Sequence, residues 1–240
     1  MLYNVFKPIV VLILRLVWRP AIEGAERIPD RGAVILASNH VSGADTVFMP
    51  AQVRRTVRFL AKSDFYSGGS LMNRMLGLFL RSIGVMPVNR SGGAASRTAI
   101  AAGLTVLERG EVLGIYPEGT RSPDGRLYRG RTGAARMALE SGCPIIPIAM
   151  LGAYEAQKGR TFLPRRRPRI RVLVGEPIDA RAAVAQMEAV SEGERLRALT
   201  DRVMDAIAAM SGQEQVPEYA SDAKRRLRAE SAAKDAASTD

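Results

Sequence analysis

Short apolar runs alternate with helix-like patterns along most of this chain, and this alternation limits the folds that it can adopt. The runs are bounded by turn residues, as buried strands are, and they lie at 33–38, 57–61, 85–88, 112–116, 144–150 and 170–175. Helical periodicity occurs at about 70–82, 94–109, 131–141 and 191–210. Strands that alternate with helices predict an α/β fold with a mostly parallel or mixed central sheet flanked by helices.

The length of 240 residues suffices for one sizeable domain, and the composition predicts three parts. Residues 1–22 are expected to form an amphipathic helix at a membrane interface, and residues 23–211 the folded domain. Residues 212–240 are rich in Ala, Ser, Glu, Lys and Asp and poor in large apolar residues. We expect this last part to be a mobile or loosely helical polar tail.

The N-terminal segment at 2–18 is strongly apolar but is interrupted by Lys7 and Arg15. It is shorter than the about 20 apolar residues of a spanning helix. On a helical wheel, Asn4, Lys7, Arg15 and Arg19 fall within roughly one third of the circle, as in a helix that lies in a bilayer interface. A helix that packs on its own domain remains an alternative. So does a signal peptide or true span, although no clear cleavage site follows.

The chain has one histidine, His40, and it comes directly after the predicted strand at 33–38. Open α/β sheets place their ligands at the carboxyl ends of strands. An imidazole can accept a proton from an alcohol, and Asp45 lies close enough in sequence to orient the ring. The alternative is that His40 caps a turn and Asp45 caps the next helix, which is the favoured interpretation for an isolated pattern of this kind.

A second polar cluster, Glu118-Gly119-Thr120-Arg121, follows the predicted strand at 112–116. The glycine allows a close approach of the backbone, and the arginine fork suits a phosphate group. Turn chemistry alone requires neither the glutamate nor the arginine. The cluster is therefore a candidate binding site for an anionic ligand.

Four segments, taken together and in order, resemble the motifs of the glycerolipid acyltransferase family, and in particular those of bacterial 1-acyl-glycerol-3-phosphate acyltransferases. The segments are N-H-x-S-x-x-D at 39–45, G-x-x-P-V-x-R at 84–90, Y-P-E-G-T-R-S at 116–122 and C-P-I-I-P-I at 143–148. The first and third are specific as a pair, whereas the second and fourth mainly add order. Two mild departures are Tyr116, where phenylalanine is common, and Cys143, where valine is common.

The resemblance implies that His40 is a general base and that Asp45 orients it. The acceptor would be a lysophospholipid, by default 1-acyl-glycerol 3-phosphate acylated at its sn-2 hydroxyl to give phosphatidic acid. The donor would be the thioester of acyl-CoA or acyl-carrier protein, with no other cofactor and no metal ion. The implied substrate-binding residues, with phosphate as their ligand, are Glu118, Gly119, Thr120, Arg121 and Arg90. A different lysolipid acceptor and a catalytically silent membrane-surface scaffold remain alternatives.

A formal net charge of +11 predicts an anionic partner. An anionic membrane surface and an acidic carrier protein both fit, whereas nucleic acid is not expected because no zinc finger or aromatic-basic platform occurs. The basic run at 165–169 is either a solvated loop or a docking site for lipid headgroups or the donor. The run Lys224-Arg225-Arg226 lies among acidic residues and is interpreted as a solvated part of the tail.

Two further inferences concern chemistry and location. Ser42, His40 and Asp45 would suit a serine hydrolase, but no G-x-S-x-G nucleophile elbow occurs. The single cysteine, Cys143, cannot form an internal disulfide, which favours a reducing compartment. Together with the N-terminal segment, this predicts a peripheral or monotopic protein on the cytoplasmic face of the cell membrane.

Overall fold

The computed structural model describes residues 2–62, 85–88, 95–157, 161, 163–185, 187 and 191–237. Its main sheet consists of strands β1 Ala21–Glu23, β2 Val34–Ser38, β3 Val57–Lys62, β4 Val85–Val88, β5 Val112–Ile115, β7 Ile145–Leu151 and β8 Arg171–Val174. A small second sheet pairs β6 Leu127–Tyr128 with β9 Gln215–Val216. The helices are α1 Leu2–Val17, α2 Asp45–Gln52, α4 Ala95–Glu108, α5 Gly133–Ser141, α6 Ala153–Ala156, α7 Ala180–Ala185, α8 Glu192–Ser211 and α9 Ala220–Ala237, with a short 3-10 helix at Ala25–Arg27.

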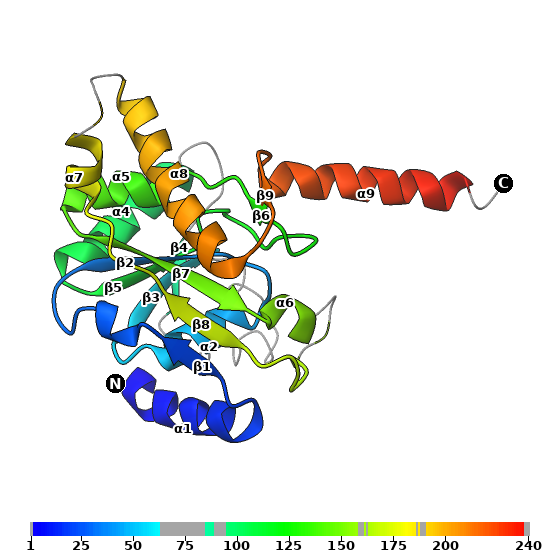
Figure 1. The fold of residues 1–240 in the computed structure, drawn as a ribbon, viewed down its shortest axis with the longest axis horizontal. Coiled ribbons are helices and arrows are strands. Elements are labelled where there is room, and N and C mark those ends of the chain that lie inside the picture. Colours follow the sequence, from blue (N-terminus) through cyan, green and yellow to red (C-terminus); the bar gives the residue numbers. More distant parts are fainter. Residues whose placement is uncertain are drawn as a thin grey trace.

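The seven strands of the main sheet follow the order β1-β8-β7-β2-β5-β3-β4 (Figure 1). Strand β2 is central and runs parallel to both β5 and β7, whereas β8 runs antiparallel to β7. The predicted α/β fold with a mixed central sheet is therefore confirmed. All six predicted strands are present within a residue or so of the expected positions. The helix predicted at about 70–82 lies outside the described residues.

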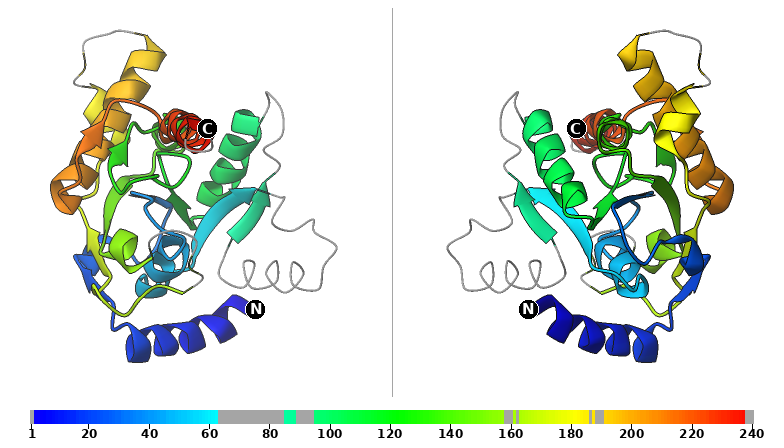
Figure 2. Two further views of the ribbon diagram at one scale, coloured as in Figure 1. Left: turned by 90° about the vertical axis from the view of Figure 1, so that its right-hand side faces the viewer. Right: turned by 90° about the vertical axis from the view of Figure 1, so that its left-hand side faces the viewer.

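Helices cover both faces of the sheet, and the alternation of side chains along β2 shows why (Figures 1 and 2). Val34 and Leu36 pack in a core with α2 and α1, whereas Ile35 and Ala37 pack in a second core with α4, α5 and α8. All four side chains are fully buried. A strand buried on both faces reads as a continuous apolar run, which is the pattern found in the sequence.

Helix α8 confirms the helical pattern predicted at 191–210. Its apolar stripe of Leu196, Leu199, Val203 and Ile207 is buried. The helix begins with a capping box, in which the Ser191 side chain accepts a hydrogen bond from the backbone of Glu194 and the Glu194 carboxylate accepts one from the backbone of Ser191. The cap and the stripe together fix the helix against the sheet next to β7.

Helix α1 packs on the domain through one of its faces. Leu14 is buried, and Trp18, just after the helix, meets the Phe48 ring edge to face with their centroids 5.9 Å apart. The Lys7 ammonium donates to the carbonyl oxygens of Val53 and Arg55, at 2.5 and 3.0 Å, just beyond the end of α2. Burial lowers the pKa of Lys7 to about 8.

The opposite face of α1 is apolar and open to solvent. Ile9, Leu12, Ile13 and Leu16 are 51%, 57%, 49% and 69% exposed. Packing on the domain, one of the placements that the sequence left open, thus uses one face of the helix and leaves the other exposed. Among the described residues, no helix is both long and apolar enough to cross a membrane.

The C-terminal segment, expected to be mobile or loosely helical, is helical, but its first part is packed on the domain. Strand β9 pairs in parallel with β6, and Ala220 and Ala223 at the start of α9 are buried against Tyr128. The remainder of α9 extends away from the domain (Figure 1). Small alanine side chains, rather than large apolar ones, make this contact, so the sequence carried no strong sign of it.

Candidate active site

The loop between β2 and α2 brings His40 and Asp45 together. Nδ1 of His40 lies 3.0 Å from Oδ2 of Asp45. The same carboxylate oxygen accepts the backbone N–H groups of Val41 and Ser42, each at 2.8 Å. Asp45 is fully buried, whereas the His40 side chain is 14% exposed. The alternative, in which Asp45 caps the next helix, is wrong: the N-cap of α2 is Ala44 and has no side-chain hydrogen bond, and the Asp45 carboxylate instead accepts from the turn before the helix and contacts the imidazole.

Aromatic rings hold the face of the His40 imidazole. Tyr116 stacks on it with the centroids 3.9 Å apart and the planes at 14°, and Phe59 stacks on Tyr116 at 5.5 Å. With Nδ1 directed at Asp45, the neutral ring carries its N–H there and leaves Nε2 as the atom that can accept a proton. The ring is thus fixed at one edge by a carboxylate and on one face by an aromatic stack.

Glu118 lies under the His40 loop and is fully buried. Its two oxygens accept the backbone N–H groups of His40, at 2.9 Å, and of Tyr128, at 3.0 Å. Burial raises the pKa of Glu118 to about 7, opposed by these two hydrogen bonds and reinforced by the negative charge of Asp45. These contacts indicate that Glu118 positions the His40 loop. They favour this role rather than the direct contact with substrate that the sequence predicted.

The loop after β5 meets the loop after β2, as their positions at the carboxyl ends of neighbouring parallel strands require. The Ser122 backbone N–H donates to the carbonyl oxygen of His40 at 2.7 Å. Arg121 is exposed, and its Nη1 lies 3.5 Å from the point where a Cβ on Gly43 would stand. The guanidinium of Arg121 therefore lies beside the loop that carries His40. Arg90, the other predicted phosphate ligand, lies outside the described residues.

Gly119 and Thr120 complete this second loop. Gly119 has a φ of +74°, a conformation that glycine adopts without strain, and its N–H donates to the carbonyl oxygen of Tyr116. A Cβ at Gly119 would stand 3.1 Å from Nε of Arg131. The Thr120 hydroxyl accepts a hydrogen bond from Nζ of Lys224, at 2.8 Å. The predicted interpretation of Lys224 as part of a solvated run is therefore wrong for this side chain.

Sequence reasoning missed two glutamines that support the His40 loop. Buried Asn39 exchanges hydrogen bonds with the backbone of Met150 and donates to Oε1 of Gln213 at 2.6 Å. Oε1 of Gln157 accepts from the Ser42 hydroxyl and from the backbone of Ala44. Asn39 belongs to the first motif and could have been singled out, but an isolated glutamine in a polar stretch carries no such signal.

The contact with Gln157 also bears on the serine hydrolase alternative. The Ser42 hydroxyl is directed at Gln157, at 2.5 Å, and the residue is 2% exposed. A nucleophilic serine needs its hydroxyl proton directed at the base and its oxygen open to substrate. The geometry of Ser42 meets neither requirement.

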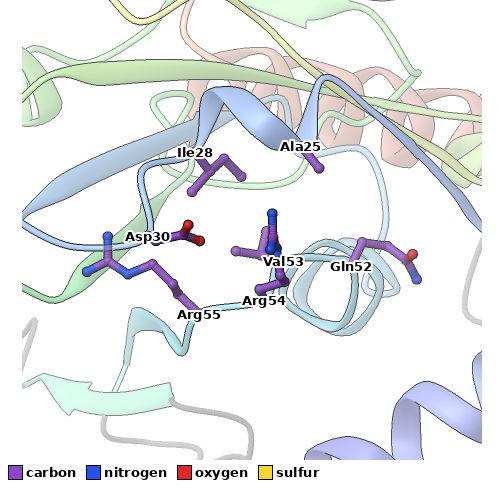
Figure 3. A pocket seen from close by; sticks show the side chains of 7 residues that line it. All are labelled: Ala25, Ile28, Asp30, Gln52, Val53, Arg54 and Arg55. Atoms are coloured by element: carbon purple, nitrogen blue, oxygen red, sulfur yellow. The ribbon is translucent and has the colours of Figure 1, made fainter.

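A pocket on the domain lies away from these motifs (Figure 3). It is lined by Ala25, Ile28, Asp30, Gln52, Val53, Arg54 and Arg55. None of the predicted site residues contributes to it. Within the described ranges, no three His, Cys, Asp or Glu side chains form a cluster that could hold a metal ion.

The fold and the paired motifs define an acyltransferase domain. The acyltransferase family model matches residues 19–151, more than half of the chain, and the chain belongs to this family. The matched region contains His40, Asp45 and the loop at 118–121.

Several relatives are named 1-acyl-sn-glycerol-3-phosphate acyltransferases. The Bacillus subtilis protein is 26% identical over 184 residues, which are 76% of this chain and 83% of the relative. A chloroplast protein of Arabidopsis thaliana is 26% identical over 158 residues, and this chain spans only 43% of its length. The crystal structure of the acyltransferase PlsC from Thermotoga maritima shares the fold, with a TM-score of 0.61 and 22% identity over 86% of this chain and 82% of that chain.

Proposed function

We propose that this protein transfers a fatty acyl group from an acyl thioester to the sn-2 hydroxyl of 1-acyl-glycerol 3-phosphate, giving phosphatidic acid. The observation that carries the proposal is the His40–Asp45 pair, placed next to an exposed arginine at the carboxyl ends of β2 and β5. The names of the relatives supply the substrate class.

His40 would act as a general base. Its Nε2 takes the proton of the acceptor hydroxyl while the oxygen attacks the thioester carbonyl carbon. The tetrahedral intermediate then expels the thiol, which receives the proton back from the imidazolium. Asp45 keeps Nδ1 protonated and its negative charge stabilises the imidazolium, as in the triads of acyl-transfer enzymes. The Tyr116 stack restricts the ring to the plane in which this transfer occurs.

The acceptor and the donor are both anionic, which fits the basic character of the chain. Arg121, together with Arg90 from the second motif, is proposed to bind the acceptor phosphate, because a guanidinium fork matches phosphate geometry. The donor is proposed to be acyl-CoA or acyl-carrier protein, and no further cofactor is needed for this chemistry.

The exposed face of α1 supports a place at the membrane surface. Its four exposed apolar side chains form a stripe, and Arg15 is exposed beside them. Such a helix can lie in the headgroup region with its apolar stripe in the acyl chains, and the net positive charge favours an anionic leaflet. We therefore propose peripheral attachment at the cytoplasmic face of the membrane, where lysophospholipid is available.

The test is acyl transfer to 1-acyl-glycerol 3-phosphate in mixed micelles, with labelled acyl-CoA and with acyl-carrier protein as donors. Wild type should form phosphatidic acid. His40→Ala should lose at least about 10²-fold in kcat, and Ser42→Ala should keep a comparable rate to wild type. A labelled acyl-serine at residue 42 would favour the hydrolase alternative. Inactivity of the wild type with both donors and a panel of lysolipids would leave the membrane-surface scaffold as the better account.

A further inference from the structure

The C-terminal helix α9 reaches the loop that carries the third motif. Lys224 is half-buried, and its Nζ donates to the hydroxyl of Thr120 at 2.8 Å. Arg228 follows one helical turn later, so that it lies on the same side of α9 as Lys224. Both residues lie outside the matched region at 19–151.

The cations around this contact are Lys224 and Arg228 from α9 and Arg121, which follows Thr120 in the loop after β5. We call them the basic cluster. Burial lowers the pKa of Lys224, and the positive charges of Arg121 and Arg228 lower it further, so both arginines lie close enough to Lys224 to repel its ammonium group. The carboxylate that opposes this effect is Glu118, which is buried and already accepts two backbone hydrogen bonds.

Other charged residues of α9 are paired, which sets the basic cluster apart. Arg225 pairs with Asp222, and Arg226 pairs with Glu218 and Glu230. Over the described residues, no ion pair joins a carboxylate to a member of the basic cluster. A bound anion would relieve the repulsion between these like charges and accept hydrogen bonds from all three side chains.

The segment that carries α9 is fastened to the site at several points. Gln213 accepts from Asn39, the residue before His40, and donates to the carbonyl oxygen of Gly125. The Arg129 N–H donates to the carbonyl oxygen of Glu218 at 3.0 Å. Arg131, which lies against Gly119, stacks on the ring of Tyr219, with its guanidinium carbon 4.9 Å from the centroid.

We propose that α9 supplies Lys224 and Arg228 to the acceptor site, where they bind the phosphate monoester of the lysophospholipid together with Arg121. This inference rests on the proposed function. The acceptor phosphate is separated from the reacting sn-2 hydroxyl only by the C2–C3–O bonds of glycerol, so it must lie near His40. Arg121 stands beside Gly43 in the His40 loop, and Lys224 contacts Thr120, the residue before Arg121. The phosphates of coenzyme A are a whole pantetheine arm away from its thioester.

The test compares Lys224→Met and Arg228→Met with Arg225→Met in the full chain. The Arg225 side chain is exposed on the same helix, and its partner is Asp222, so it provides a matched loss of charge. Lys224→Met should raise the KM for 1-acyl-glycerol 3-phosphate about tenfold or more, because a charge-assisted contact is lost. The KM for acyl-CoA and the kcat/KM with uncharged 1-acyl-glycerol should change by less than twofold. Lys224→Arg should recover most of the affinity.

Three results would overturn the inference. One is a Lys224→Met variant with the same acceptor KM as Arg225→Met. Another is a rise in the KM for acyl-CoA instead, which would assign the cluster to the donor. The third is an equal loss with 1-acyl-glycerol, which would indicate a structural role and would be accompanied by a lower melting temperature.

A binding experiment separates this inference from the proposed function. Calorimetry measures the binding of 1-acyl-glycerol 3-phosphate in detergent micelles and requires no turnover. The two proteins compared are His40→Ala and the double variant that carries both His40→Ala and Lys224→Met. Weaker binding by the double variant supports the cluster even if the wild type proves inactive in every transfer assay. Equal binding by the two proteins refutes the cluster even if the wild type makes phosphatidic acid.

Discussion

Replacement of Asp45 separates its structural role from its proposed catalytic one. One buried oxygen, Oδ2, faces His40 Nδ1 and accepts the backbone N–H groups of Val41 and Ser42. In Asp45→Ala, both N–H groups lose their acceptor within a buried loop, at a cost of about 1–3 kcal/mol each, or about 2–6 kcal/mol together. In Asp45→Asn, the amide oxygen can still accept both, and the amide nitrogen takes the buried place of Oδ1, so the loss of stability should be smaller, about 1–3 kcal/mol.

Activity should respond differently from stability in this pair. Both variants lack the negative charge that stabilises the imidazolium, so both should lose on the order of 10²–10⁴-fold in kcat. Urea unfolding measures the stability, and acyl transfer in mixed micelles measures the rate. For a chain of this size, 2 kcal/mol corresponds to a fall in melting temperature of at least about 4 °C. Equal stability of the two variants, or an Asp45→Asn variant with wild-type kcat, would refute the reasoning.

Three other perturbations test separate parts of the molecule. Burial raises the pKa of Glu118 to about 7 from 4.5, so the folded protein binds this proton more tightly than the unfolded chain does. The free energy of unfolding should therefore fall by about 3 kcal/mol as the pH rises from about 4.5 to 7. Glu118→Gln should remove this pH dependence in urea unfolding at about pH 5 and 8, and an unchanged pH dependence would contradict the assignment. Leu16→Glu, on the exposed face of α1, should reduce co-sedimentation with anionic vesicles and leave the melting temperature unchanged. Replacement of the buried Leu14 in Leu14→Ala should instead cost about 2–5 kcal/mol of stability. Vesicle binding by Leu16→Glu equal to that of the wild type would argue against the proposed membrane face. A Cβ at Gly114 would stand 2.5 Å from the ring of Phe59, so Gly114→Ala should destabilise the fold by about 1–3 kcal/mol in the same unfolding assay. If the variant were as stable as the wild type, the ring would be shown to move aside freely.

The sheet was predictable from the sequence because strands buried on both faces are continuous apolar runs. Val34 to Ser38 form such a run and became the central strand β2. Strand β1 at Ala21–Glu23 was not predicted, since three residues, two half-buried and one exposed, carry no pattern. Helix α2 was expected only as a helix after Asp45, without bounds, because its eight residues are too few to show a helical period.

The core of the site was predictable for a different reason. His40 and Asp45 are close in sequence, and the strand before them fixes where they lie. Lys224, Gln213 and Gln157 could not be found in this way, because each reaches the site from a distant part of the chain through one or two hydrogen bonds. Nor did composition identify Glu118 as buried, since the charge that marked it as a candidate ligand is turned inward and held by backbone N–H groups.

The hydrogen bond from Asn39 to Gln213 joins residues 174 positions apart. Contacts over such separations form late, because much of the chain must be ordered before the two ends can meet. During synthesis, His40 and Asp45 leave the ribosome together, long before Gln213 is added. A nascent chain would therefore hold His40 on a loop that lacks this support. The order of translation thus delays completion of the site until the C-terminal segment has docked.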